Sequence, residues 1–195
     1  DKNSQISIFE DEVLVKTKDG KTFKSDYAEY NRSSNLIIFK KNVFAEDSKN
    51  NQINTEFAEY NGLTKLFISR GTTRIITSEN YQLDGQDIEY DSNVKKIRSE
   101  KKTTILDEDK NKIFLENFEF SVNENIFRSI GLIKVQDKEK NTYEFTQIYI
   151  DTKKKEILGT DIKAYLNQDN FKVKKENKPR IFSNSVQLNN NESKF

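Results

Sequence analysis

Apolar positions recur along this chain with a step of 30 residues. The column that shows the period best runs through the closing residue of a short A-E-Y motif. Its members are Tyr30, Tyr60, Tyr90, Phe120 and Ile150, followed by Leu188 after a longer interval of 38 residues. Positions seven before and two before each of these anchors are apolar as well. A regular period of this kind predicts about six copies of one supersecondary unit.

Alternation within each unit predicts its secondary structure. Ala28 and Tyr30 lie two residues apart, and Ile37, Val43 and Ala45 share one parity, which is the period of a β-strand. Polar segments such as NRSS and DTKK separate the two strands, and each begins with Asn or Asp, which favour turns. Each unit is therefore predicted to be two strands joined by a tight turn.

Two architectures stack such units, a parallel β-helix and an antiparallel roll. Turns of about four residues favour the antiparallel roll, because parallel neighbours need a crossover of roughly a dozen residues or more. No sustained helical periodicity interrupts the pattern. Pro179, the only proline, is expected to start the final strand or to lie at a sheet edge. The expected fold class is all-β.

Composition narrows the function by exclusion. The chain of 195 residues has 33 basic and 32 acidic side chains, so no strong overall field attracts nucleic acid. It contains no Cys and no His, which excludes disulfides, imidazole metal sites and Ser-His or Cys-His catalysis. No apolar run approaches the roughly 18 residues of a membrane-spanning helix. We therefore expect no catalytic residues, no metal and no cofactor.

The repeat units carry a resemblance to a known family. SDYAEYN at 25–31 and EFAEYN at 56–61, each followed by a turn and an apolar strand, resemble the OstA-like repeat of lipopolysaccharide-transport proteins. The likeness covers about residues 13–188. The stretch KPRIFSNSVQLNNNESKF, 178–195, resembles the segment that leads from the periplasmic domain into the barrel in the outer-membrane assembly protein of that family.

Four positions depart from the family pattern. Lys41 and Lys101 stand where the family often has glycine, and Tyr149 and Gln187 replace the acid of the A-E-Y motif. These departures bear on individual residues, whereas the repeat itself is kept in every unit.

The resemblance implies an antiparallel β-jellyroll, open along one side and built from about six two-strand units. It implies that this domain is the periplasmic part of an outer-membrane protein of a Gram-negative bacterium, and that it serves as a lipid conduit. Such a conduit receives lipopolysaccharide from a bridge of like domains and passes it to an outer-membrane barrel for surface assembly. We expect one domain over 1–188 and, at 189–195, the start of a linker toward a missing C-terminal barrel.

The implied partners are four. They are lipopolysaccharide, a periplasmic bridge protein of the same fold that adds an edge strand, the barrel of the same chain, and the barrel's plug lipoprotein. Exposing an acyl chain of about a dozen carbons to water costs on the order of 10 kcal/mol, so a conduit needs a continuous apolar track. Inward-facing columns on successive strands would supply one.

Two apolar columns are the candidates for that track. We predict that the lipid is lined by Ile37, Phe67, Ile97, Phe127 and Ile157, with Tyr30, Tyr60, Tyr90 and Phe120 opposite them. A β-bulge between Phe23 and Ala28 would shift the parity and change which column faces inward.

The free end of the roll is the expected partner interface. The last unit leads toward the barrel, so the first strands, residues 6–39, should receive the bridge protein through unpaired backbone groups. The expected edge residues are Ile6, Ile8, Val13, Val15 and Phe23. Lys153, Lys154 and Lys155 form a charge run that we interpret as a solvated turn, with head-group phosphates as the other reading.

Three other functions fit parts of the pattern. An enzyme of the β-helix type would need paired carboxylates, which the column Glu29, Glu59, Glu89 and Glu119 could supply. This column repeats in four units, whereas an active site occurs once, so outward-facing residues are the simpler interpretation. The chain could also be a separate periplasmic bridge protein of the same pathway, and only the segment 178–195 argues against this alternative. A structural solenoid without ligand would have a closed, fully packed interior instead of an open apolar channel.

Overall fold

The computed structural model describes residues 5–167, 179–189 and 193–194. The chain divides into two compact units, Asp1–Ser99 (unit 1) and Glu100–Phe195 (unit 2). The expectation of one domain over 1–188 stays a prediction. Within the described ranges no helix has the length and apolar character needed to cross a membrane.

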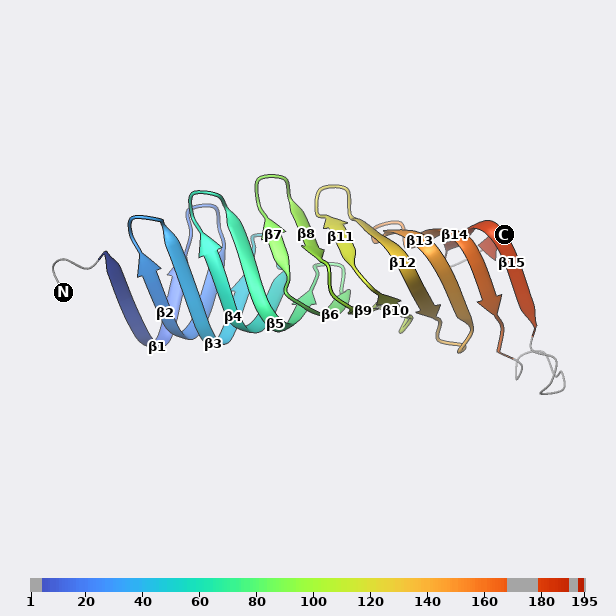
Figure 1. The fold of residues 1–195 in the computed structure, drawn as a ribbon, viewed down its shortest axis with the longest axis horizontal. Coiled ribbons are helices and arrows are strands. Elements are labelled where there is room, and N and C mark those ends of the chain that lie inside the picture. The colour runs from blue at the N-terminus through green and yellow to red at the C-terminus, as the bar shows by residue number, and fades with distance from the viewer. Residues whose placement is uncertain (1–4, 168–178, 190–192, 195) are drawn as a thin grey trace. The chain divides into compact units, whose positions relative to one another are not determined.

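Unit 1 is an antiparallel meander in which each strand from β1 to β5 pairs with the next strand along the chain (Figure 1). β6 and β7 both pair with β5, so they are two halves of one interrupted strand. The strands are β1 (Ile6–Lys16), β2 (Thr22–Asn31), β3 (Leu36–Glu46), β4 (Gln52–Asn61), β5 (Leu66–Ile76), β6 (Gln82–Gln86), β7 (Glu89–Asp91) and β8 (Lys96–Ser99).

Unit 2 repeats the meander. β10 and β11 both pair with β12, again as halves of one strand. The strands are β9 (Thr103–Leu106), β10 (Lys112–Leu115), β11 (Phe118–Ser121), β12 (Ile126–Gln136), β13 (Thr142–Asp151), β14 (Glu156–Tyr165), β15 (Arg180–Asn189) and β16 (Ser193–Lys194). β15 follows Pro179 directly and pairs with β14 along its whole length. Positions 178, 190–192 and 195 of the segment 178–195 lie outside the described residues.

The predicted turns are present and are closed by the predicted polar residues. The Asn31 side-chain oxygen accepts hydrogen bonds from the amides of Ser33 and Ser34, at 3.0 and 3.2 Å. Asn61 and Asp151 accept equivalent bonds one and four repeats later. These local bonds replace ladder hydrogen bonds and reverse the chain.

A second set of turns closes the other ends of the hairpins. Asp47 accepts hydrogen bonds from the amides of Lys49 and Asn51, at 2.8 and 3.0 Å, and from the Asn51 side-chain amide at 2.9 Å. Asp137 and Asn141 repeat this arrangement in unit 2. The Asn51 side-chain oxygen also accepts the Ser78 amide at 3.0 Å, so it ties one turn to the next.

The long strands bend near their middles. The β1 and β3 ladders shift register where Asp11, Glu12, Lys41 and Asn42 adopt positive φ of 49–63°. The β2–β3 ladder shifts register between Lys24 and Tyr27, within the stretch where a bulge would change which apolar column faces inward. Bulges bend a strand and increase its twist, so each long strand contributes one half to each of two facing layers.

The two layers of unit 1 meet across aromatic rings. Phe23, in the first half of β2, stacks on Phe39 with ring centroids 5.2 Å apart and lies 5.1 Å from the ring of Tyr60. Phe39 and Tyr60 come from the strand halves on the other side of the bulges. All pairings in both units are antiparallel, so the all-β antiparallel prediction is confirmed and the parallel β-helix is excluded.

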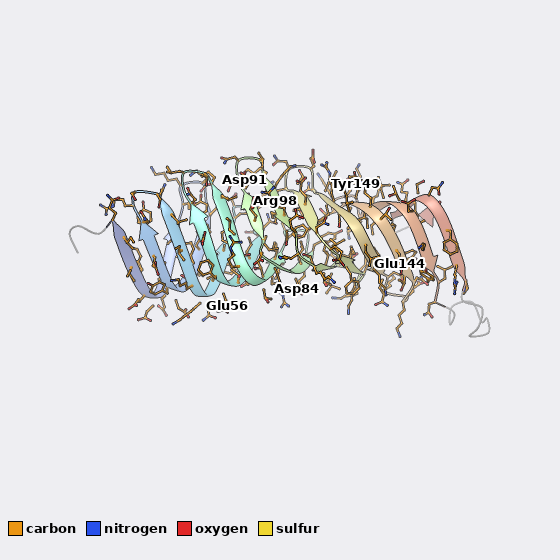
Figure 2. The ribbon with its side chains drawn as sticks, in the orientation of Figure 1. Glu56, Asp84, Asp91, Arg98, Glu144 and Tyr149 are labelled. Atoms are coloured by element: carbon orange, nitrogen blue, oxygen red, sulfur yellow. The ribbon has the colours of Figure 1, made fainter. Side chains whose placement is uncertain are left out.

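The outer face is polar and carries cross-strand ion pairs. Figure 2 shows charged side chains such as Asp84 and Arg98 on the strands of unit 1. Arg74 Nε lies 2.6 Å from Asp84 Oδ1, and Arg98 Nη2 lies 2.5 Å from Glu89 Oε1. Exposed pairs of this kind contribute little to stability, about 0–1 kcal/mol each, so the fold depends on the inner face.

Candidate functional site: a cavity at the end of unit 1

A cavity of about 650 Å³ lies at the β1 end of unit 1. Its walls are mostly apolar and come from β1, β2, β3 and β4. The apolar lining consists of Phe9, Val15, Ala28, Ile37 and the rings of Tyr30 and Tyr60. A volume of this size and a lining of this kind are typical of sites for small molecules or for part of a lipid.

The cavity lies beside β1, the end strand of the sheet that the structure describes. Phe9 on β1 is the counterpart of Phe39 one period later, and both pair with Ala28. Phe39 is completely buried and Phe9 is 48% exposed, since β3 has a paired strand on each side and β1 pairs with β2 alone among the described residues. The packing that fills the interior at Phe39 is therefore incomplete at Phe9, and the inner face is open to a ligand.

Lysines surround the cavity. Lys16, Lys18 and Lys65 contribute to its lining, and none of them takes part in an ion pair among the described residues. Lys21 is buried, contacts Asp19 as an ion pair, and places its Nζ 6.0 Å from the centre of the Tyr60 ring. The positive charge at this opening exceeds the negative charge.

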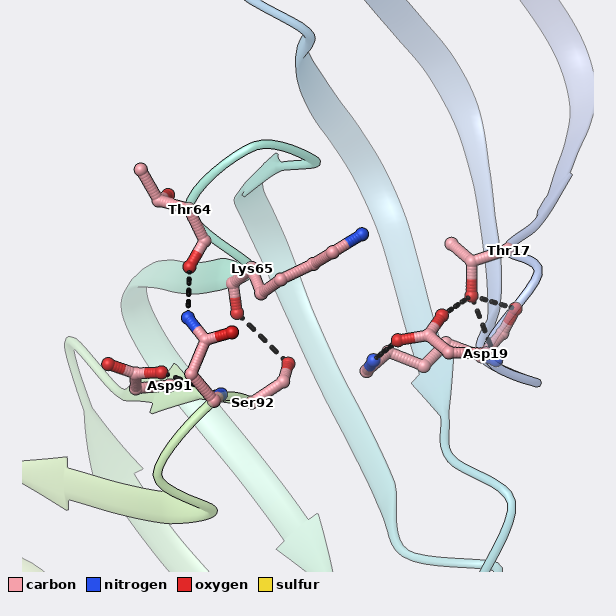
Figure 3. A network of polar contacts seen from close by, with 8 residues as sticks. Thr17, Asp19, Thr64, Lys65, Asp91 and Ser92 are labelled. Atoms are coloured by element: carbon pink, nitrogen blue, oxygen red, sulfur yellow. Dashed lines mark hydrogen bonds and ion pairs between the residues drawn. The ribbon is translucent and has the colours of Figure 1, made fainter.

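Asp19 is held by its own turn. Lys21 and Thr17 donate hydrogen bonds to its carboxylate, and these two bonds, Lys21 first, lower the pKa of Asp19 to about 2 (Figure 3). The Lys21 amide in turn donates to Thr17 Oγ1 at 3.0 Å. Asp19 is therefore ionised throughout the neutral range, and its charge is balanced by Lys21.

The opposite wall is fixed by bonds between turns. Ser92 Oγ donates to the Lys65 carbonyl at 2.9 Å, and Asn93 Nδ2 donates to the Thr64 carbonyl at 2.7 Å (Figure 3). Lys65 itself has a φ of 60°, in the left-handed region. The backbone that carries the Lys65 side chain is thus positioned before any ligand binds.

Tyr60 is the unusual polar residue of this cavity. It is 3% exposed, and its hydroxyl has no hydrogen-bond partner in the part of the chain that the structure describes. Burial, followed by the nearby charge of Asp19, raises the pKa of Tyr60, so the hydroxyl keeps its proton at neutral pH. An unsatisfied buried hydroxyl costs free energy, which makes it a feature that needs an explanation.

The predicted lining residues all lie toward the inner face but in two environments. Tyr30, Ile37 and Tyr60 line the cavity. Phe67 is 2% exposed and lies 6.1 Å from the Phe23 ring. The remaining predicted lining residues are buried or half-buried. The two predicted columns face each other across neighbouring strands, beside the turns. The pairs are Tyr30–Ile37, Tyr60–Phe67, Tyr90–Ile97 and Phe120–Phe127.

Unit 2 is packed where a lipid track was expected. Phe127 is 1% exposed and stacks on Phe120 with ring centroids 4.2 Å apart. The Phe118 ring lies 5.9 Å from that of Phe127. Ile157 on β14 is half-buried and pairs with Ile150. These side chains pack against their neighbours in the ligand-free structure, and their role in lining a lipid stays a prediction.

The predicted edge residues separate into three groups. Ile6 and Ile8 lie on β1, the end strand of unit 1, and are 48% and 60% exposed. Val15 lines the cavity. Val13 and Phe23 are buried, and Phe23 lies on β2, behind the edge strand.

The carboxylate column forms ion pairs. Glu29 Oε1 lies 2.7 Å from Lys40 Nζ and accepts the Tyr27 hydroxyl, and these bonds lower the pKa of Glu29. Glu119 Oε1 lies 3.9 Å from an Arg128 nitrogen. A general acid needs the opposite shift, toward a raised pKa. In the described ranges no three or more potential metal ligands gather in one place.

The Lys153–Lys155 run lies on a turn. The amides of Lys153 and Lys154 donate to Asp151 Oδ1, and Lys155 Nζ lies 2.7 Å from Glu108 Oε2. The geometry matches the solvated-turn interpretation.

Phe9, Asn35 and the three lysines of the cavity were not predicted from the sequence. Phe9 was within reach, because it precedes Phe39 by one period of 30 residues. The polar lining depends on which turn residues meet in space, and this is not visible in a column pattern.

Fold and cavity together define an all-β repeat protein with a lysine-rimmed apolar cavity at one end. No family model matches the sequence, and no curated protein matches it. One similar solved structure is that of LptH from Pseudomonas aeruginosa, described as the LptA-homologous periplasmic component of the lipopolysaccharide transport device. It is 12% identical, over 85% of this chain and 96% of that chain, with a TM-score of 0.31. A likeness of that size carries no argument about this chain, so the interpretation rests on the residues described above.

Proposed function

We propose that this chain is a periplasmic lipid carrier of the lipopolysaccharide-transport type, and that an acyl chain enters it through the cavity at the β1 end. One observation carries the proposal. The inward-facing column predicted to line the lipid opens into a cavity of about 650 Å³ at Tyr30, Ile37 and Tyr60. The OstA-like repeat of the sequence supplies the class of lipid.

The proposal includes no catalysis. The carboxylate column that an enzyme would need is engaged in outer-face pairs at Glu29, Glu89 and Glu119. A carrier must release what it binds, and many modest apolar contacts suit release better than a deep polar pocket.

Two placements of the roll are consistent with this role. In one it is the periplasmic N-terminal domain of the outer-membrane protein LptD, joined to a barrel and its plug lipoprotein, as the segment 178–195 suggests. In the other it is a separate bridge protein. β1, as an end strand with exposed Ile8, is the surface on which a like domain would add its strand in either case. The mass of the natural protein, with or without a barrel, separates the two.

Photo-crosslinking tests the carrier role. A photoreactive amino acid replaces Ile37, which lines the cavity, and in a matched variant Ile38, the next residue on β3 with the opposite orientation. We expect purified lipopolysaccharide to be captured at Ile37 and not at Ile38. Capture at neither position would refute the carrier role and favour a ligand-free structural solenoid.

A further inference from the structure

The two sets of turns face each other within each unit, and they do so in the same register. In unit 1 Lys18 and Lys65 belong to two different turns, and both line the cavity. In unit 2 Lys155 and Glu108 also belong to two different turns, and their side chains form an ion pair. Lys155 follows Lys65, and Glu108 follows Lys18, by three periods of 30 residues. We call these two equivalent pairs the rim pairs.

Opposite charges face each other at the rim pair of unit 2. The turn at 107–111 contains three acids and one lysine, and the turn at 151–155 contains one acid and three lysines. Lys155 Nζ donates a hydrogen bond to Glu108 Oε2 at 2.7 Å. This bond and the charge of Glu108, followed by the charges of the two aspartates on the same turn, raise the pKa of Lys155. The lysine run therefore faces a turn of opposite charge.

Like charges face each other at the rim pair of unit 1. Neither Lys18 nor Lys65 forms an ion pair in the part of the chain that the structure describes, and Asp19 is already engaged in an ion pair on its own turn. One period further along, the equivalent positions are Ser48 and Lys95, which cannot form an ion pair either. Of these three positions, only the one in unit 2 can hold its turns together by charge.

We infer that the ion pair between Lys155 and Glu108 is a latch, which closes the interior of unit 2 on the side of the turns and opens it when the pair breaks. The packing of the two units agrees with this role. A cavity stands open beside the repelling pair of unit 1, whereas inner residues such as Phe127 and Val135 are buried in unit 2. The inference goes beyond the carrier function, because the latch would act with or without a lipid.

A latch must be weak enough to open. The side chains of Lys155 and Glu108 are 40% and 39% exposed, so water screens the attraction between them. An exposed pair of this kind shifts an equilibrium by about threefold. Added salt screens it further, because charges interact over only about 10 Å at 0.1 M ionic strength. We therefore expect the pair to change how often the turns part, and not whether unit 2 folds.

The chain contains no cysteine, so a single introduced thiol can report the opening. Val135 is 2% exposed and lies beside a turn of unit 2, and Ala45 is its equivalent three periods earlier, in unit 1. Val135→Cys and Ala45→Cys are each labelled with a thiol reagent, without denaturant and without lipid. Lys155→Gln should speed the labelling of Val135→Cys about threefold at low salt, and this difference should vanish at high salt. Labelling of Ala45→Cys should not change.

Charge reversal distinguishes a latch from a merely structural contact. Glu108→Lys alone should speed the labelling of Val135→Cys, and Glu108→Lys together with Lys155→Glu should restore the parent rate. Lys154→Gln is the matched control and should have no effect, because Lys154 pairs with Asp151 of its own turn at 3.5 Å. Parent rates in Lys155→Gln and Glu108→Lys, or a double variant that labels as fast as the single ones, would overturn the inference.

The equivalence of the rim pairs gives a test in the opposite direction. Lys18→Glu places a carboxylate opposite Lys65, so it should slow the labelling of Ile37→Cys in the cavity about threefold relative to Lys18→Gln. Equal rates in these two variants would overturn the inference, because the rims of the two units would not be equivalent. Lipid is absent from all these measurements, so capture of lipopolysaccharide at Ile37, which tests the carrier function, succeeds or fails independently.

Discussion

Gly159 of β14 is the position where the packing of unit 2 leaves least room for change. A Cβ at Gly159 would lie 2.1 Å from Phe145 Cδ1 and 2.4 Å from Cε1, far inside van der Waals contact. Phe145 is 2% exposed and is surrounded by core, so its ring cannot move into solvent. Gly159→Ala should therefore force a strained rearrangement, which costs about 1–3 kcal/mol in well-packed interiors.

The experiment is a double-mutant cycle in urea, followed by far-ultraviolet circular dichroism. Thermal unfolding can be followed in parallel, since for a chain of this size a loss of about 1 kcal/mol in unfolding free energy lowers the melting temperature by roughly 2–4 °C. Phe145→Ala alone should cost about 3–5 kcal/mol, because it leaves a cavity. In that background Gly159→Ala should cost nothing, since the ring that it strikes is gone.

The coupling free energy is the decisive quantity. Residues in direct contact show non-additivity of about 0.5–3 kcal/mol, whereas distant ones add. If Gly159→Ala destabilised the protein equally with and without Phe145, or left the parent unchanged, the steric argument would be wrong.

Two further predictions concern the turns and the tyrosines. Asp137→Ala should destabilise unit 2 by about 1–2 kcal/mol in urea unfolding, because the carboxylate accepts hydrogen bonds from the Glu139 and Asn141 amides. The control variant Asp137→Asn keeps one acceptor oxygen and should retain most of the stability. Burial raises the pKa of Tyr90 to about 12 and that of Tyr143 further. Because the pKa of each phenol is higher in the folded protein than in the unfolded chain, its protonation stabilises the folded state. This contribution to the free energy of unfolding is fully present below the unfolded pKa of about 10 and is lost as the pH rises toward 12. An absorbance titration should show these phenols ionising after the exposed ones, and simultaneous ionisation of all tyrosines would contradict it.

Short-range patterns made the strands and one set of turns predictable. Ala28 and Tyr30 alternate as a strand requires, and Asn31 closes the turn that follows, because both features depend on neighbours in sequence. The sequence pattern left open a parity shift between Phe23 and Ala28, and the register shift of the β2–β3 ladder between Lys24 and Tyr27 lies in that stretch. The second turns were equally periodic, with Asp47 and Asn51 repeated as Asp137 and Asn141, and this signal was present but not used.

The cavity could not be derived from the repeat pattern, because equivalent positions of the repeat have different surroundings in the folded protein. Phe9 and Phe39 have the same place in the pattern, yet one is 48% exposed and the other is completely buried. A column of equivalent residues carries no information on which copy lacks a neighbour.

The position of the cavity sets an order of events for a lipid carrier. Ile37 lies in the open cavity, whereas Phe67 is buried and its ring lies 6.1 Å from that of Phe23 in the ligand-free protein. A lipid that moves inward must displace those rings, which costs packing contacts that the entering chain restores with its own methylene groups. Loading at the cavity should thus be fast and passage inward slow. In a time course of photo-crosslinking, capture at Ile37 should precede capture at Phe67, and simultaneous capture at both would show that the rings open without lipid.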